Sequence, residues 1–145
     1  MSIKGGFVET YGFHKTRIKI FASDWVADND STSYSILVYD TADNGSVMVG
    51  NSGIEAYAFK EIPHGYKATH CRINCSDSLE VKVYKCDISG SAGVEIQDNA
   101  STQYTNTEFT LTETSADDNN YLMIFVYTTA TTNYIRGGYV TIERI

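Results

Sequence analysis

Three histidines, His14, His64 and His70, are the side chains best suited to acid–base or metal chemistry near neutral pH. None of them stands in a recognisable nucleophile or metal-ligand motif, and the chain contains no G-x-S-x-G, H-E-x-x-H, P-loop or C-x-x-C sequence. We expect His64 to belong to a turn and His70 to the solvent-facing side of a strand. The sequence gives no support to a hydrolase or a zinc enzyme, and we predict neither a catalytic residue nor a cofactor.

Acidic side chains gather in three segments that could offer oxygen ligands to calcium. The three groups are Asp24, Asp28 and Asp30; Asp40, Asp43 and Asn44; and Asp117, Asp118 and Asn119. None follows the EF-hand order, because Ala42 stands third from Asp40 and Asn51 stands twelfth, where a bidentate Glu is required. Asp and Asn side chains are also common in turns, where they form hydrogen bonds with the nearby backbone. Turns are the simpler interpretation, and calcium binding is the alternative.

Aromatic side chains are the other candidates for a binding role. The chain has 11 Tyr and a single Trp, Trp25. Such rings could stack on sugars or anchor a protein interface, as in a carbohydrate-binding module. Tyr is also an ordinary strand residue, and at least four, Tyr34, Tyr39, Tyr121 and Tyr127, fall inside predicted strands. Trp25, in a predicted polar loop, is the better surface candidate, although a lone loop Trp more often fills the edge of a core.

Length and charge limit the possible partners. At 145 residues the chain has the size of one domain that can fold without disulfides or a metal. Eleven basic against 18 acidic residues give a net charge of −7, which opposes binding to nucleic acid or to an anionic membrane. We find neither a signal-peptide run nor a membrane-spanning stretch, and we therefore expect synthesis in the cytoplasm.

The three cysteines are predicted to be free thiols. Cys71 and Cys75 share one face of a predicted strand but lie about 13 Å apart along it, which is too far for a disulfide. Cys86 is expected to face the opposite way.

Short strand patterns recur along the whole chain, and no window shows the apolar spacing of a long helix. Residues 16–21 alternate apolar and basic side chains. Residues 34–39 are apolar on both faces and predict a central strand, and residues 121–127 predict a core strand buried on both faces. Residues 68–75 and 79–86 predict a hairpin that turns at residues 76–78. Pro63 and Gly65 suit a type I turn that starts at Ile62.

These patterns predict an all-β fold, a two-sheet antiparallel sandwich of jelly-roll-like form, over residues 15–145. Residues 1–14 are predicted to be an amino-terminal arm. Its aromatic side chains, Phe7, Tyr11 and Phe13, need burial against this domain or a neighbouring subunit.

Four stretches of the chain resemble small virion proteins of tailed phages that infect aquatic bacteria. The stretches are RIKIFASDWVADND (17–30), YAFKEIPHGYKATHCRI (57–73), VKVYKCDI (81–88) and GGYVTI (137–142). The likeness covers most of the chain and consists of turn and strand segments such as IPHGYKATH. It carries no catalytic motif, and we assign no site residue from it.

The resemblance implies a non-enzymatic capsid decoration (cement) subunit on the virion surface, made in the cytoplasm of the bacterial host. Such a subunit would be a homotrimer that binds the phage major capsid protein. The residues themselves, apart from the resemblance, make Phe7, Tyr11, Phe13 and Trp25 the candidates for its interfaces. The alternative is a receptor- or glycan-binding module of a phage tail or head fibre, whose partner would be a host surface glycan.

Overall fold

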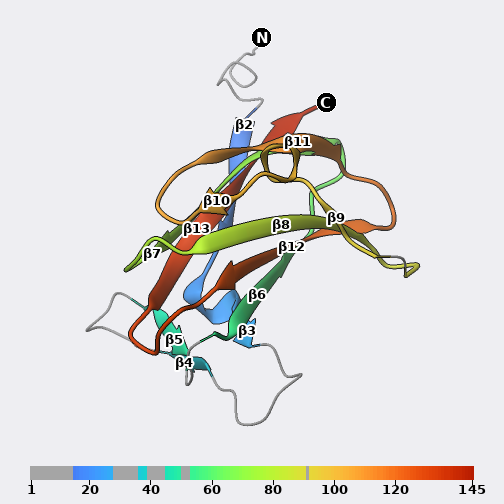
Figure 1. Ribbon diagram of the computed structural model, residues 1–145. Helices are drawn as coiled ribbons and strands as arrows, with labels where there is room; N and C mark the ends of the chain where they lie inside the picture. Colours follow the sequence, from blue (N-terminus) through green and yellow to red (C-terminus); the bar gives the residue numbers. More distant parts are fainter. Residues whose placement is uncertain (1–14, 28–35, 39–44, 50–52, 91) are drawn as a thin grey trace.

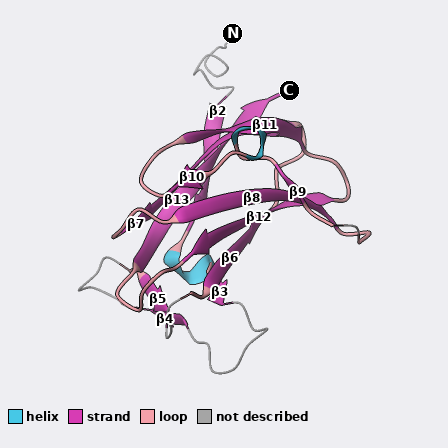
Figure 2. Cartoon of the chain, viewed as in Figure 1, coloured by secondary structure: helices cyan, strands magenta, loops and turns pink. Residues whose placement is uncertain are grey.

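The computed structural model describes residues 15–27, 36–38, 45–49, 53–90 and 92–145. Over these residues the chain forms two antiparallel sheets that enclose a common core (Figure 1). Figure 2 shows that strands and the loops between them make up nearly all of the described chain. The predicted all-β, two-sheet, jelly-roll-like sandwich is confirmed.

Each sheet has six strands among the described residues. Sheet I has the strand order β10-β8-β12-β6-β3, with β9 paired to β8. Its strands are β3 (Val26–Ala27), β6 (Glu55–Lys60), β8 (Glu80–Asp87), β9 (Val94–Glu95), β10 (Gln103–Tyr104) and β12 (Asn120–Tyr127). Sheet II has the order β11-β7-β13-β5-β4, with β2 paired to β13. Its strands are β2 (Lys15–Ile20), β4 (Ile36–Val38), β5 (Val47–Val49), β7 (Tyr66–Cys75), β11 (Phe109–Ser115) and β13 (Tyr134–Arg144).

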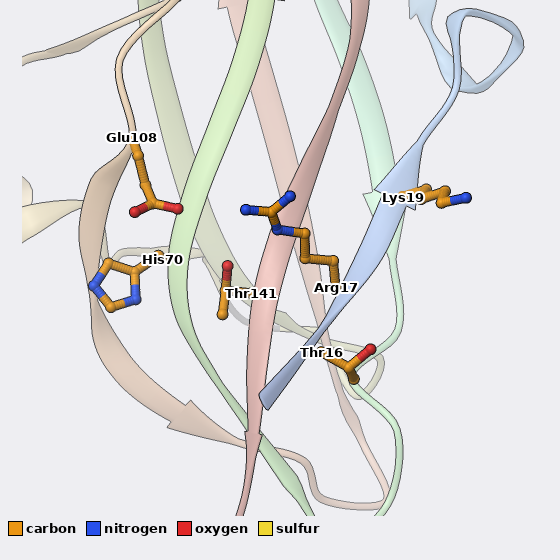
Figure 3. A pocket seen from close by; sticks show the side chains of 6 residues that line it. All are labelled: Thr16, Arg17, Lys19, His70, Glu108 and Thr141. Carbon is orange, nitrogen blue, oxygen red and sulfur yellow. The ribbon is translucent and has the colours of Figure 1, made fainter. Parts of the chain in front are cut away.

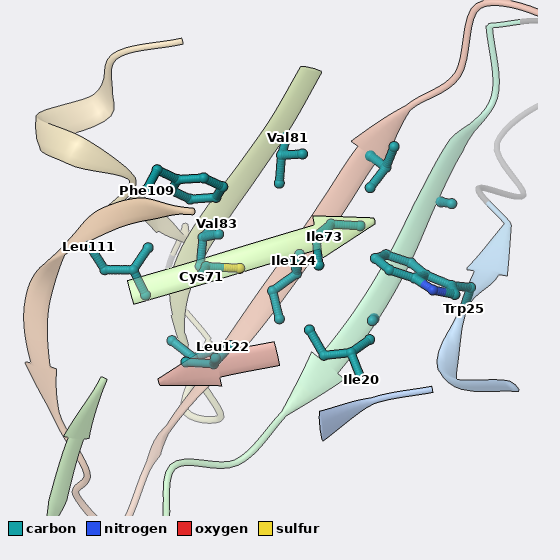
Figure 4. Close-up of a cluster of buried hydrophobic side chains, with 14 of the residues drawn as sticks. Ile20, Trp25, Cys71, Ile73, Val81, Val83, Phe109, Leu111, Leu122 and Ile124 are labelled. Atoms are coloured by element: carbon teal, nitrogen blue, oxygen red, sulfur yellow. The ribbon is translucent and has the colours of Figure 1, made fainter. Parts of the chain in front are cut away.

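The core lies between the two sheets (Figure 4). Along each strand every second side chain points inward, because successive side chains of a strand alternate between its faces. β12 contributes Leu122, Ile124 and Val126 from sheet I, and β7 contributes Cys71 and Ile73 from sheet II. All five are fully buried, and each large aliphatic side chain contributes about 1.5 to 3 kcal/mol through its burial.

The predicted hairpin of residues 68–75 and 79–86 is wrong. β7 pairs with β11 and β13 in sheet II, whereas β8 pairs with β12, β9 and β10 in sheet I. The connection at residues 76–79 therefore carries the chain from one sheet to the other. Ile73 and Val81 both face the core, as expected, but from opposite sheets.

Two strands differ from their predicted positions. β4 is the described part of residues 34–39. Among the described strands it lies at one end of sheet II, so it is not central. β12 is central in sheet I, but its outward side chains Tyr121 and Met123 are only half-buried and Tyr127 is exposed. The strand is therefore not buried on both faces. Its apolar outward side chains produced the pattern of a doubly buried strand.

The turn at Pro63 is shifted by one residue from the predicted type I turn. The amide N–H of Tyr66 donates to the carbonyl of Pro63 at 3.1 Å, which makes Gly65 the third residue of the turn. Gly65 has a φ of 86°, a conformation that favours glycine and that a type I turn does not use at its third position.

The closing strand β13 runs through Gly137 and Gly138. A Cβ at Gly138 would stand 2.2 Å from the carbonyl oxygen of Arg72, so only glycine allows β7 to approach this closely.

The described chain has only two short 3-10 helices, η1 (Ala22–Asp24) and η2 (Asp98–Ala100), in agreement with the absence of a long helix from the sequence pattern. Within the described residues no helix is both long and apolar enough to cross a membrane. Cys71, Cys75 and Cys86 are free thiols, as predicted. The predicted arm, residues 1–14, lies outside the described residues.

Candidate binding surface on sheet I

The outward face of sheet I carries a continuous set of aromatic side chains. They come from the three neighbouring strands β6, β12 and β8. Together with one methionine we call this set the aromatic face. Its members are Tyr57, Phe59, Tyr84, Tyr121, Met123 and Phe125. Their orientation follows from strand alternation. Ala56 and Ala58 of β6 are buried in the core, so Tyr57 and Phe59 between and after them must point outward.

The rings of the aromatic face contact one another across the strands. Tyr57 lies directly opposite Phe125 in the sheet, with ring centroids 5.7 Å apart and an interplanar angle of 26°. Phe59 lies 6.4 Å from Tyr57 on the same strand, with an interplanar angle of 16°. Tyr121 contacts Phe59, and Tyr84 contacts Phe125. Each of these two ring pairs has an interplanar angle of 53°.

The side chains of the aromatic face differ in their exposure to solvent. Phe125, at its centre, is only 7% exposed because the neighbouring rings cover it. Phe59, toward β3, is 50% exposed. An apolar ring left half in water is unfavourable unless a ligand or partner covers it, so Phe59 marks the part of this surface most available for contact.

A shallow hollow of about 200 Å³ lies on this face and has both apolar and polar walls. It is lined by Glu55, Tyr57, Lys82, Tyr84, Met123 and Phe125. The Tyr57 hydroxyl donates to the Glu55 carboxylate. The Tyr84 hydroxyl, at 3.3 Å, and the Lys82 ammonium, at 3.4 Å, both donate to Oε1 of Glu95. Hydroxyl, ammonium and carboxylate groups thus stand beside the rings.

The charges around this hollow are set by contacts among these same groups. The pKa of Glu95 lies below its usual value, chiefly because Gln97 donates to its carboxylate at 2.9 Å, with help from Lys82. The pKa of Lys82 is raised, first by the neighbouring Tyr84 and then by Glu95. Burial, followed by the Glu95 charge, raises the pKa of Tyr84. At neutral pH the lining of the hollow therefore carries an ammonium and an intact phenol, and both donate to the Glu95 carboxylate beside it.

This arrangement is suited to holding a ligand by contact. The described residues contain no group of three or more His, Cys, Asp or Glu side chains placed to hold a metal ion. Two of the acidic residues considered for calcium make other contacts. Asp24 pairs with Lys60 at 2.6 Å, and Asp117 accepts from the backbone N–H of Asn119 and Asn120 within its own turn.

The residues singled out from the sequence do not meet at this surface. Trp25 is 4% exposed, and its indole N–H donates to the Arg136 carbonyl at 3.2 Å, so the ring fills the core. This burial corrects the expectation that Trp25 contributes to an interface. Phe7, Tyr11 and Phe13 lie outside the described residues.

The histidines are likewise separate from the aromatic face. His64 is exposed in a turn, and His70, half-buried on sheet II, has Nδ1 3.0 Å from the Thr69 hydroxyl. His14 falls outside the part of the chain that the structure describes.

The sequence interpretation missed Tyr57, Phe59, Tyr84 and Phe125 as a group. A usable signal is present in β6, where small Ala residues alternate with aromatic ones in Ala56-Tyr57-Ala58-Phe59. Such alternation indicates that the small side chains fit beneath a tightly packed sheet and that the large rings occupy the open face.

No protein-family model matches the chain, and no curated protein matches it. Solved structures with a similar outline include the CBM22-1–GH10 modules of endo-1,4-β-D-xylanase 10B from Clostridium thermocellum, with a TM-score of 0.46, 18% identity and 86% of this chain covered. This chain spans only 27% of that structure.

Two smaller structures are matched over nearly their whole length. The C-terminal CBM6 of LamC, a laminarinase of Zobellia galactanivorans, has a TM-score of 0.43 and 14% identity, with 89% of this chain and 100% of that one covered. A family 35 carbohydrate-binding module of Clostridium thermocellum has a TM-score of 0.45 and 10% identity, with 90% and 99% covered. At these values the likeness concerns the outline of a β-sandwich only.

Proposed function

We propose that this domain is a non-catalytic carbohydrate-binding module and that the aromatic face of sheet I is its binding surface. The observation that carries the proposal is the ring cluster of Tyr57, Phe59 and Phe125, which stands on the outside of the sheet beside the polar groups of the hollow.

The chemistry of a sugar matches both parts of this surface. A pyranose ring presents a patch of C–H groups on its faces and hydroxyl groups around its edge. The C–H patch is covered by an aromatic ring, and the hydroxyls need donors and acceptors close by. Phe59 and Tyr57 supply the rings, while Glu95, Lys82 and the Tyr84 hydroxyl supply the polar contacts.

A purely structural role for the rings makes a different prediction. Cross-strand aromatic pairs stabilise a sheet by about 0.2 to 1 kcal/mol each, and Tyr57 with Phe125 is such a pair. That role explains Phe125, which is covered by its neighbours. It explains only part of Phe59, whose ring contacts Tyr57 and Tyr121 but remains half exposed.

The experiment is a binding screen of the whole chain against a panel of neutral and charged polysaccharides by affinity gel electrophoresis. We expect retardation by at least one polysaccharide and its loss in the double variant Tyr57→Ala/Phe59→Ala. The matched control is Phe21→Ala, because Phe21, which directly follows β2, is a 57% exposed phenylalanine that lies near Lys60 and makes none of the ring contacts of the aromatic face.

The screen has two outcomes that would contradict the proposal. One is that no polysaccharide retards the folded protein. The other is that the double variant, with an unchanged thermal unfolding profile, is retarded as strongly as the parent.

The capsid decoration role and the virion location stay predictions from the resemblance. The arm residues predicted to form the interfaces of such a subunit, Phe7, Tyr11 and Phe13, lie outside the described residues. Trp25, the other predicted interface residue, is in the core. The predicted alternative, a glycan-binding module, is the one that the aromatic face supports. Whether such a module belongs to a phage fibre is tested by its copurification with virions.

A further inference from the structure

A second hollow lies on the outward face of sheet II, opposite the aromatic face. Its volume is about 700 Å³, and it is lined by Thr16, Arg17, Lys19, His70, Glu108 and Thr141. These residues come from β2, β7, β13 and the segment before β11, so the hollow runs across three neighbouring strands and reaches the start of a fourth. We call it the sheet II groove (Figure 3).

Strand register arranges the side chains of the groove in rows across the sheet. Lys19 lies opposite Tyr139, which in turn lies opposite Arg72. In the next row Arg17 lies opposite Thr141, which lies opposite His70. Each row thus places a basic side chain of β2 next to a hydroxyl-bearing side chain of β13.

Arg17 is held at one side of the groove. Its guanidinium carbon lies 3.9 Å from the centre of the Tyr139 ring, a cation–π contact that fixes the group over the face of the sheet. The Tyr139 hydroxyl donates to Oε2 of Glu108 at 2.8 Å. Figure 3 shows Arg17 reaching across the groove, with Thr141 beside it and Glu108 and His70 on the far side.

The charge balance of the groove is opposite to that of the whole chain. The chain has a net charge of −7, but Arg17, Lys19 and Arg72 face this surface against the carboxylate of Glu108. Glu108 already accepts the Tyr139 hydroxyl, and among the described residues neither Arg17 nor Lys19 forms an ion pair. The N–H donors of Arg17 remain open to a ligand.

We propose that the sheet II groove binds an anionic group, a carboxylate or a sulfate ester, of a polar ligand, with Arg17 as its principal contact. The planar fork of N–H donors on Arg17 suits two oxygens of one anion. Lys19 adds a second positive charge, and the hydroxyls of Thr16 and Thr141 contact polar groups next to the anion. This site is separate from the aromatic face and does not depend on the function proposed for it.

Three oligosaccharide probes test the proposal with the whole chain at fixed ionic strength. They are an oligogalacturonate, its methyl ester, which lacks the charge, and a sulfated galactan oligosaccharide. NMR amide and guanidinium signals report where each probe binds. We expect the oligogalacturonate or the sulfated probe to shift the signals of Arg17 and Thr141, and the methyl ester to leave them unchanged. The two charged probes tell carboxylate recognition from sulfate recognition.

Three variants give the test its controls. Arg17→Gln should weaken binding of the charged probe about tenfold, because a charge-assisted hydrogen bond is lost. Glu108→Gln should strengthen it, because an opposing charge is removed. Arg144→Gln should change nothing, since Arg144 stands over another tyrosine, Tyr66, outside the groove lining. All three substitutions replace surface groups, and thermal unfolding confirms that the fold is kept.

The outcomes are distinguishable from those of the carbohydrate proposal. Phe59→Ala should leave binding in the groove intact even if it abolishes binding at the aromatic face. The proposal is overturned if the methyl ester binds as well as the acid, if neither charged probe shifts the groove signals, or if Arg17→Gln and Arg144→Gln weaken binding equally.

Discussion

Tyr57 of β6 and Phe125 of β12 lie directly opposite each other in sheet I, with ring centroids 5.7 Å apart and both rings on the outside of the sandwich. Their backbone neighbours Ala56 and Val126, also opposite each other, are fully buried on the inside. One pair of adjacent strands therefore serves two purposes. Its inner side chains build the core, and its outer side chains form the aromatic face.

This division predicts different effects for two adjacent substitutions in β12. Val126→Asp places an unpaired carboxylate in the core, at a cost of several kcal/mol against a typical total stability of about 5 to 15 kcal/mol. We expect it to unfold the domain. Tyr127→Asp, one residue later, changes a side chain that is 40% exposed and should leave the domain folded. Circular dichroism melting curves of both variants check this, and a Val126→Asp variant that melts like the parent would show that β12 is not core.

The three thiols should differ in reactivity. Burial, with a smaller effect of the Glu108 charge, raises the pKa of the Cys71 thiol, so its reactive thiolate is scarce. Cys86 is only half-buried. A thiol reagent should find three free thiols in denatured, unreduced protein and should modify Cys86 first in the native protein. Cys86→Ser should remove that first phase. A count of one thiol, or a first phase that persists in Cys86→Ser, would contradict this account.

The ion pair of Asp24 and Lys60 predicts a loss of stability in acid. Burial pushes the pKa of Asp24 up, but the hydrogen bonds from Lys60 and from the backbone N–H of Phe21, with the Lys60 charge, bring it below its usual value of 3.8. A depressed folded-state pKa means that the contribution is present above about pH 4 and is lost as the pH falls through the folded-state pKa.

Comparison with Asp24→Asn measures this contribution. Urea unfolding at pH 7 and near pH 3 should show the parent losing more stability on acidification than the variant does, by less than about 1 kcal/mol because the pair is partly exposed. Lys60→Met should reduce the difference. Equal acid sensitivity in the parent and in Asp24→Asn would mean that the pair contributes nothing measurable.

Strand existence and the identity of the core could be predicted from the sequence, because alternation depends only on local side-chain order. Ile18 and Ile20 of β2 show this: they alternate with Arg17 and Lys19, and both turn toward the core.

Strand pairing could not be predicted in the same way. Residues 76–78 have the length of a hairpin turn, yet the chain changes sheets there. The crossing is held from a distance, because the Asn106 side chain accepts from the Cys75 N–H and the Thr105 hydroxyl accepts from the Leu79 N–H. Both partners stand roughly thirty residues further along the chain, outside any local window.

The candidate surface was hidden for a related reason. An outward aromatic residue and a buried one look alike in a sequence, so residues 121–127 predicted a strand buried on both faces. Only the pairing of β12 with β6 shows that Phe125 meets Tyr57 on the outer side. Trp25 is the reverse case: its ring is buried, and its indole N–H donates to the carbonyl of Arg136, which is 111 residues away in sequence.

The measurement that tests the central claim most directly is calorimetric titration of the polysaccharide that the screen identifies into the parent, Phe59→Ala and Phe21→Ala. Phe59→Ala removes one contact between an aromatic ring and the sugar, worth about 1 kcal/mol. We therefore expect this variant to bind the polysaccharide about fivefold more weakly than the parent, with an unchanged melting temperature. Phe21→Ala should bind like the parent. Equal affinities of Phe59→Ala and the parent, or equal losses in both variants, would contradict the assignment of the aromatic face as the carbohydrate-binding surface.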